Sequence, residues 1–81
     1  MLNYNDALKH IECRGAHVVY NYLPHHAVRH FRSVVAPNGV RIGDIRQPAL
    51  DKMIKEGVLV ETSRKVEGDH LQVIYKVKDH E

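Results

Sequence analysis

"IRQPALDKMIKEGVLVE", residues 45–61, is the stretch that decides the predicted fold. Pro48 suits the first turn of a helix, because a backbone N–H at that position would have no partner within the helix. Three apolar side chains then recur at the spacing of one helical face: Leu50, Met53 and Ile54. Gly57 is typical of a helix end, and "VLVET" (58–62) favours a strand. The stretch therefore predicts a helix over about 47–56 that leads directly into a strand.

The C-terminal part of the chain predicts a β-hairpin. In "LQVIYKV" (71–77) the side chains alternate, and one side of the alternation consists of Leu71, Val73, Tyr75 and Val77. The preceding segment "SRKVEGDH" (63–70) is polar, and Gly68 with Asp69 supplies its turn. We therefore expect two strands, 58–62 and 71–77, joined by a long polar loop that is basic at one end.

The N-terminal part predicts one helix and one ambiguous segment. Over 5–14, Asn5 can cap a helix, Asp6 favours its positive N-terminus, and Gly15 ends it. The next segment, "HVVYNYL" (17–23), is rich in residue types that favour a strand. It also places four side chains on one helical stripe, so a helix is the alternative. A short strand is the preferred interpretation.

"LPHHAVRHF" (23–31) begins the clearest helical pattern in the chain. Pro24 suits a first helical turn. Apolar side chains then repeat at intervals of three and four, at Ala27, Val28, Phe31, Val34 and Val35. The following segment, "APNGVRIGD" (36–44), has the residue types of a turn. The sequence therefore predicts a second helix over 24–35, followed by a turn region.

The resulting order is helix, short strand, helix, turn, helix, strand, loop, strand. This order, with "IRQPALDKMIKEGVLVE" and "GDHLQVIYKV" above all, resembles the winged helix-turn-helix DNA-binding domain family. The resemblance covers 45–81 closely and 5–44 in outline, while the link from Val35 to Gln47 is longer than the family's usual turn. It implies an α+β fold: a small winged helix with three helices, a C-terminal β-hairpin wing and a short strand after the first helix.

The resemblance also implies a DNA-binding surface. In this family the third helix enters the major groove with its N-terminus first. Its exposed positions in this sequence are Arg46, Gln47, Asp51, Lys52 and Lys55. Arginine and glutamine pair with guanine and adenine edges, and lysine neutralises phosphate. The wing would add Arg64 and Lys65, and weaker candidate contacts on the second helix are His25, His26 and Arg29.

Three histidines within "LPHHAVRHF" raise the question of a metal site or a proton-handling site. His26 and His30 are four residues apart, so on a helix both could ligate one metal ion. A structural zinc site needs four ligands, and the sequence has neither a CxxC nor a HExxH motif. Histidines that charge together below about pH 6.5 could also sense pH. We interpret them as the solvated face of a helix, and we predict no metal and no other cofactor.

Composition limits the remaining classes of function. The 81 residues carry a formal net charge of +2, which permits a nucleic-acid partner without requiring one. Cys13 is the only cysteine, no apolar run is long enough to span a membrane, and the N-terminus lacks the pattern of a secretory signal. We therefore expect a cytoplasmic protein with one domain, 1–81, that ends in a polar tail at 77–81.

The sequence contains no glycine elbow around a nucleophile and no phosphate-binding loop, so we predict that the protein is not an enzyme. The predicted function is sequence-specific binding of double-stranded DNA by a small transcriptional regulator, whose brevity fits a phage or mobile element. Specific binding by so small a unit is expected to need a homodimer, with Tyr20 and Tyr22 as candidate contacts. The alternative is a winged-helix module that binds a protein partner, as an inhibitor or adaptor, without binding DNA.

Overall fold

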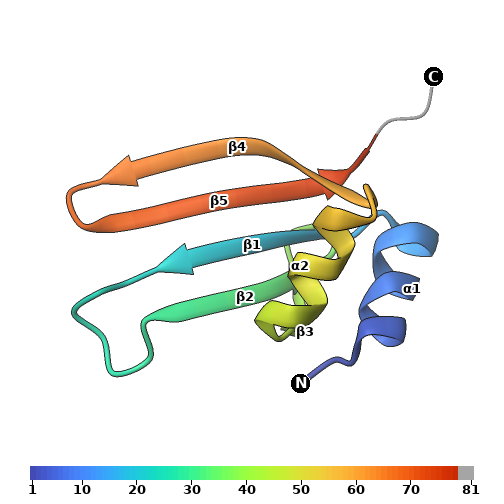
Figure 1. Ribbon diagram of the computed structural model, residues 1–81, viewed down its shortest axis with the longest axis horizontal. Coiled ribbons are helices and arrows are strands. Elements are labelled where there is room, and N and C mark those ends of the chain that lie inside the picture. The colour runs from blue at the N-terminus through green and yellow to red at the C-terminus, as the bar shows by residue number, and fades with distance from the viewer. Residues whose placement is uncertain (79–81) are drawn as a thin grey trace.

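The structure, a computed structural model, describes residues 1–78 (Figure 1). Its elements in chain order are α1 (Tyr4–Arg14), β1 (His17–Tyr22), β2 (His30–Val35), β3 (Arg41–Asp44), α2 (Gln47–Lys55), β4 (Leu59–Glu67) and β5 (His70–Val77). The strands form one antiparallel sheet in the order β3-β2-β1-β5-β4. β1 is therefore the central strand, and β3 and β4 are the edges of the sheet.

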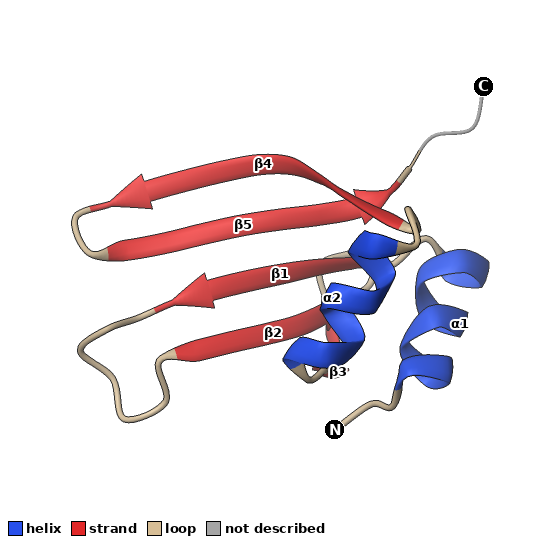
Figure 2. Ribbon diagram, in the orientation of Figure 1, coloured by secondary structure: helices blue, strands red, loops and turns tan. Residues whose placement is uncertain are grey.

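Both helices lie on one face of the sheet and at one end of it (Figure 2). Beyond the helices, β1, β2, β4 and β5 continue toward two hairpin ends that no helix covers (Figure 1). We call this part of the sheet the distal half, and it comprises residues 20–22, 30–32, 64–67 and 70–73. Val18 of β1 is fully buried beneath the helices. Because side chains alternate between the two faces of a strand, Tyr20 and Tyr22 lie on the same face as Val18, which is the helix side.

The predicted winged helix with three helices is wrong. Residues 24–35, predicted as the second helix, instead form a loop followed by β2. Of the five apolar side chains that suggested a helix, only Val34 is buried, and Val28 is 57% exposed. Each residue of β2 pairs with a residue of β1. This pairing between segments that are separate in the sequence outweighs the local helical pattern.

Two further boundaries need correction. The polar connection predicted over 63–70 is mostly strand, because β4 continues to Glu67 and leaves only a short turn before β5. The turn region predicted over 36–44 contains the edge strand β3. Of the predicted polar tail, 77–81, Val77 belongs to β5, and 79–81 lie outside the described residues. The other elements are confirmed with nearly the same bounds: α1, β1, α2 and β5.

α1 has a well-defined start and end. The side-chain oxygen of Asn3, rather than Asn5, accepts a hydrogen bond from the backbone N–H of Asp6 at 2.8 Å and caps the helix. Gly15 follows the last turn with φ of 70°, a left-handed conformation that glycine adopts without steric cost. α1 is thus stopped abruptly, and the chain can turn directly into β1.

The hydrophobic core lies between the helices and the adjoining end of the sheet. Its buried members come from both helices, three strands and the links between elements, and they are Ala7, Ile11, Ala16, Val18, Val34, Ile45, Leu50, Met53 and Leu59. Met53 is 0% exposed and attaches α2 to this cluster. The position of α2 on the sheet therefore depends on the packing of Met53 and Leu50.

Met53→Ala is expected to lower the free energy of unfolding by about 2–5 kcal/mol, because the shorter side chain leaves a cavity between α2 and the sheet. Urea denaturation followed by circular dichroism measures this loss. Lys55→Ala, on the exposed side of the same helix, is the matched control and should change the free energy of unfolding by less than about 0.5 kcal/mol. Equal losses for the two variants would contradict the placement of Met53 in the core.

Candidate functional site

The helix side of the distal half carries a row of four side chains, one from each strand. Antiparallel pairing places them side by side in the order Arg32, Tyr20, Val73 and Arg64. Val73 is 1% exposed, and the guanidinium carbon of Arg32 lies 5.4 Å from the centre of the Tyr20 ring. A cation at this distance is attracted to the face of the ring. The row therefore has an arginine at each end, and the half-buried Tyr20, rather than the buried Val73, supplies the accessible apolar surface between them.

The next row outward is richer in aromatic and apolar side chains. Its members are His30, Tyr22, Leu71 and Val66. The centre of the His30 ring lies 6.0 Å from that of Tyr20, with the ring planes 15° apart, and 5.0 Å from that of Tyr22, with the ring planes 34° apart. His30 Nδ1 and the Tyr20 hydroxyl are hydrogen-bonded at 2.7 Å. We call the two rows together the aromatic platform.

α2 borders the aromatic platform and forms a shallow hollow with it, which we call the α2 hollow. One stripe of α2 supplies its wall, and this stripe consists of Gln47, Leu50, Asp51 and Ile54. The floor is formed by Tyr20, Arg32 and Tyr75, and the volume of the hollow is about 230 Å³. Nη2 of Arg32 donates a hydrogen bond to Oε1 of Gln47 at 3.3 Å, which connects the floor to the wall.

Polar groups converge on this hollow from both its floor and its wall. Burial raises the pKa of the Tyr75 hydroxyl, and the Glu61 and Asp51 carboxylates raise it further. Tyr75 therefore keeps its proton at neutral pH and can donate a hydrogen bond. Within residues 1–78 the Asp51 carboxylate has no ion-pair partner, unlike Asp44, Glu61, Glu67 and Asp69.

Two contacts tie the ends of the hairpins together. Nε2 of His25, in the loop between β1 and β2, lies 2.7 Å from Oδ2 of Asp69 in the turn between β4 and β5. On the opposite face of the sheet, Nε2 of His70 lies 3.1 Å from Oδ1 of Asn21. The distal half is therefore held as one four-stranded unit rather than as two separate hairpins.

The structure separates the helix residues that were predicted to bind DNA. All five are exposed on or beside α2: Arg46, Gln47, Asp51, Lys52 and Lys55. Gln47 and Asp51 line the α2 hollow, whereas Arg46 and Lys52 line a different pocket at the N-terminal segment. One helix thus contributes to two sites, and only one of them adjoins the aromatic platform.

The predicted wing residues are also divided. Arg64 belongs to the aromatic platform, while Lys65, the next residue along β4, points to the opposite face. Each cation has a carboxylate partner at 2.8 Å, Glu61 for Arg64 and Glu67 for Lys65. The weaker candidates all lie in the exposed loop before β2: His25, His26 and Arg29.

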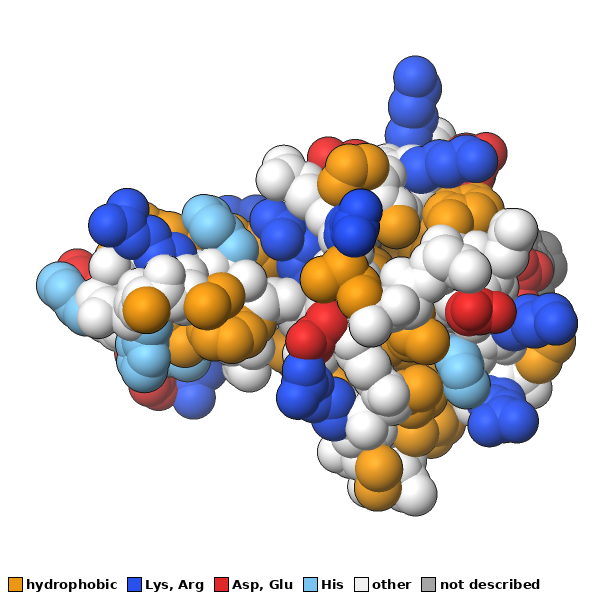
Figure 3. Space-filling model, turned by 90° about the horizontal axis from the view of Figure 1, so that it is seen from below, with side chains coloured by type: hydrophobic (Ala, Val, Ile, Leu, Met, Phe, Trp, Pro, Cys, Tyr) orange, Lys and Arg blue, Asp and Glu red, His pale blue; other side chains and the backbone are white. Residues whose placement is uncertain are grey.

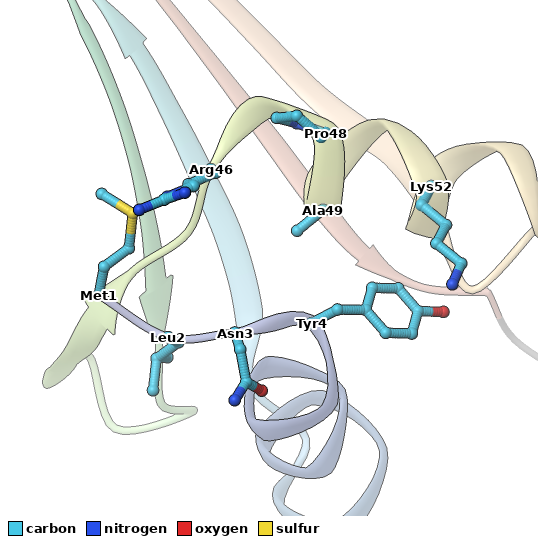
Figure 4. A pocket seen from close by; sticks show the side chains of 8 residues that line it. All are labelled: Met1, Leu2, Asn3, Tyr4, Arg46, Pro48, Ala49 and Lys52. Atoms are coloured by element: carbon cyan, nitrogen blue, oxygen red, sulfur yellow. The ribbon is translucent and has the colours of Figure 1, made fainter.

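The second pocket, about 610 Å³ in volume, lies between the N-terminal segment and α2 (Figure 4). Nζ of Lys52 lies 4.3 Å from the centre of the Tyr4 ring, and Nε of Arg46 lies 3.2 Å from Sδ of Met1. The Tyr4 hydroxyl donates a hydrogen bond to the Glu56 carboxylate, which raises the pKa of Tyr4. We place the candidate site at the aromatic platform, because it brings three aromatic rings together with an arginine whose hydrogen bond goes to a neutral amide.

The histidines do not form the pair that the sequence suggested. His26 lies in a loop and His30 begins β2, so the two do not share a helical face. His25 and His30 each contact another side chain, and no group of three metal-ligating side chains occurs in the described part of the chain. Figure 3 shows histidine, lysine and arginine side chains on the narrow lobe at the left, with hydrophobic side chains between them.

The sequence suggested Tyr20 and Tyr22 as dimer contacts and His30 as a possible metal ligand, but it did not place these residues with Arg32 on one surface. The signal that could have identified them is the alternation in "HFRSVV" (30–35), which places His30 and Arg32 on the same side as the buried Val34. That signal becomes useful only after the segment is recognised as a strand.

No family model matches the chain, and no curated protein or solved structure matches it. The candidate site therefore rests on its own geometry and chemistry.

His17 lies on the opposite face of the sheet, near the ammonium group of Lys76. Burial lowers the pKa of the His17 imidazole, and the ammonium group of Lys76 lowers it further. The folded protein therefore resists protonation of His17 more than the unfolded chain does. Below the ordinary histidine pKa of about 6.5, the unfolded state binds this proton more readily, so His17 costs stability as the pH falls.

His17→Gln is therefore expected to become more stable relative to the wild type when the pH is lowered from about 7.5 to about 5.5, since glutamine does not titrate. Urea unfolding of both proteins at the two pH values measures the change. His26→Gln, in the exposed loop, is the matched control. A difference in unfolding free energy that stays constant between the two pH values would show that His17 is not disfavoured in its charged form.

Proposed function

We propose that the protein binds single-stranded nucleic acid on the aromatic platform, without catalysing a reaction on it. The observation that carries this proposal is the cluster of the Tyr20, Tyr22 and His30 rings on an uncovered part of the sheet, with the guanidinium carbon of Arg32 5.4 Å from the centre of the Tyr20 ring. Unpaired bases stack on aromatic side chains and arginine planes, while cations beside them hold the phosphates. Because every base has a stacking face, this surface would provide affinity for many sequences.

The dimensions of the distal half favour a single strand over a duplex. Four strands about 4.8 Å apart span roughly 14 Å between the outer backbones, whereas the major groove of DNA is about 12 Å wide. A single strand of nucleic acid can instead lie along the two rows of the aromatic platform. The expectation of duplex recognition by a third helix depended on the winged-helix resemblance, which the observed fold does not share, so duplex DNA becomes a comparison in the test.

The charge of the platform is modest, which limits the number of phosphates that it can neutralise. Arg64 is paired with Glu61, whereas the contact of Arg32 with the neutral amide of Gln47 leaves its charge uncompensated. Arg29 is exposed in the adjoining loop. The logarithm of the binding constant falls linearly with the logarithm of the salt concentration, and each phosphate neutralised on a single strand adds about 0.7 to the steepness of this slope. We therefore expect a shallow salt dependence, with one or two phosphates held.

A protein partner is the second candidate function, and the opposite face of the sheet favours it. That face carries four half-buried apolar side chains, Val19, Phe31, Val35 and Ile74. A solvated face of an antiparallel sheet is normally polar, so a second copy of the chain or another protein would remove this apolar surface from water. A homodimer through this face would differ from the one expected from the sequence, because Tyr20 and Tyr22 lie on the other face and would stay free for the platform.

We also propose a reducing cytoplasmic location. Cys13 is an exposed free thiol, which such a compartment would preserve. In the part of the chain that the structure describes, neither helix is long and apolar enough to cross a membrane. Regulation of transcription remains a prediction from the sequence.

The proposal is tested by fluorescence anisotropy with labelled ten-nucleotide strands of thymidine or uridine and with a duplex of the same length, at low salt. Tyr22→Ala should weaken single-strand binding fivefold or more, because stacking of one base contributes about 1–3 kcal/mol. Tyr22→Phe keeps the ring and should retain most of the affinity. Circular dichroism establishes that each variant is folded.

Arg29→Ala should weaken single-strand binding and reduce the salt dependence by about 0.7 if its guanidinium, exposed in the loop beside the platform, holds one phosphate. Arg14→Ala, which removes the same charge at the exposed end of α1, is the matched control and should leave both quantities unchanged. If neither the thymidine strand nor the uridine strand binds at low salt, the proposed function is wrong. Tighter binding of the duplex would also contradict it.

A further inference from the structure

We infer that the α2 hollow is a binding pocket for one guanine base of the bound strand. This inference rests on the proposed function and adds a base preference to it: the aromatic platform stacks bases of any kind, and the hollow beside it recognises one. The juxtaposition that carries it is an unpaired carboxylate, Asp51, and a guanidinium, Arg32, at the edges of a hollow lined by two tyrosines.

The shape of the hollow suits a single flat ring system. Its volume of about 230 Å³ is smaller than the roughly 300–1,000 Å³ of pockets for drug-sized ligands. Tyr20 and Tyr75 line it from the sheet, with Arg32 beside the Tyr20 ring, and Leu50 and Ile54 line it from α2. Ile54 is 38% exposed although it is apolar, so a bound base would cover part of a side chain that water now contacts.

The hydrogen-bonding groups of the hollow select among the bases. The Asp51 carboxylate only accepts hydrogen bonds, and the Arg32 guanidinium only donates them. Guanine presents two adjacent donors, N1–H and the N2 amino group, on one edge and two adjacent acceptors, O6 and N7, on the other. A carboxylate can accept hydrogen bonds from N1–H and the N2 amino group, and the arginine fork can donate hydrogen bonds to O6 and N7. Guanine therefore satisfies both side chains at once.

The other bases satisfy these side chains less completely. Adenine and cytosine offer one amino group to the carboxylate, and thymine and uracil offer one ring N–H. Each would leave one oxygen of Asp51 without a donor from the base, and a polar group that loses its partner on burial weakens binding.

The test uses four labelled ten-nucleotide thymidine strands that differ at one central position, which is guanine, adenine, cytosine or thymine. The strand with guanine is expected to bind about tenfold more tightly than the other three, the discrimination of one well-formed two-bond contact. Asp51→Asn exchanges an acceptor for a donor and should reduce this ratio to about twofold or less. Asp6→Asn removes the same charge from exposed α1 and should keep the tenfold ratio.

The outcomes separate this inference from the proposed function. If all four strands bind with equal affinity, the guanine pocket is wrong, while single-strand binding by the platform stands. If none of them binds, both are wrong. A guanine preference that persists unchanged in folded Asp51→Asn, as judged by circular dichroism, would overturn the assignment of the pocket to the α2 hollow.

Discussion

The packing of two short helices against one end of a longer sheet determines the rest of the structure. Val18 and Val34, opposite each other on β1 and β2, are fully buried there together with Met53 of α2. A helix is about 10 Å across, whereas the nine residues of β4 extend for about 30 Å. Because the helices run across the strands in Figure 2, they cannot cover the full length of the sheet. The uncovered distal half is a direct consequence of these element lengths.

An uncovered half-sheet must be stabilised by contacts within and between its own strands. The Tyr20–His30 hydrogen bond, the Arg32 cation over Tyr20 and the Asn21–His70 contact are of this kind. Such cross-strand pairs contribute about 0.2–1 kcal/mol each, which is much less than the packing of a core side chain. The distal half is therefore less stable than the helix-covered end, and a ligand that stacks on its rings would add to its stability.

The parts of the fold that the sequence predicted are those with local signals. Pro48 and Gly57 mark both ends of α2, and the alternation of β5 needs no knowledge of its partners. The prediction for 24–35 was wrong because its apolar spacing fits a helix, whereas the strand that forms there depends on pairing with β1, a separate segment of the chain. The same error concealed the candidate site: Gln47 and Asp51 were predicted as exposed, but the platform that they face exists only when His30–Val35 is a strand.

The unequal placement of charge around the α2 hollow determines how a bound single strand of nucleic acid would lie on the protein. Asp51 stands on the wall of the hollow without a cationic partner among residues 1–78, so phosphates are disfavoured there and the N–H groups of a base are favoured. Arg29 is exposed in the loop that precedes β2, and His30 is the first residue of β2. The bases would therefore point toward α2, and the backbone would follow the outer row of the platform, away from the helix. In this orientation stacking would supply most of the affinity, and the Asp51 carboxylate, which weakens attraction for phosphate, would supply the selectivity.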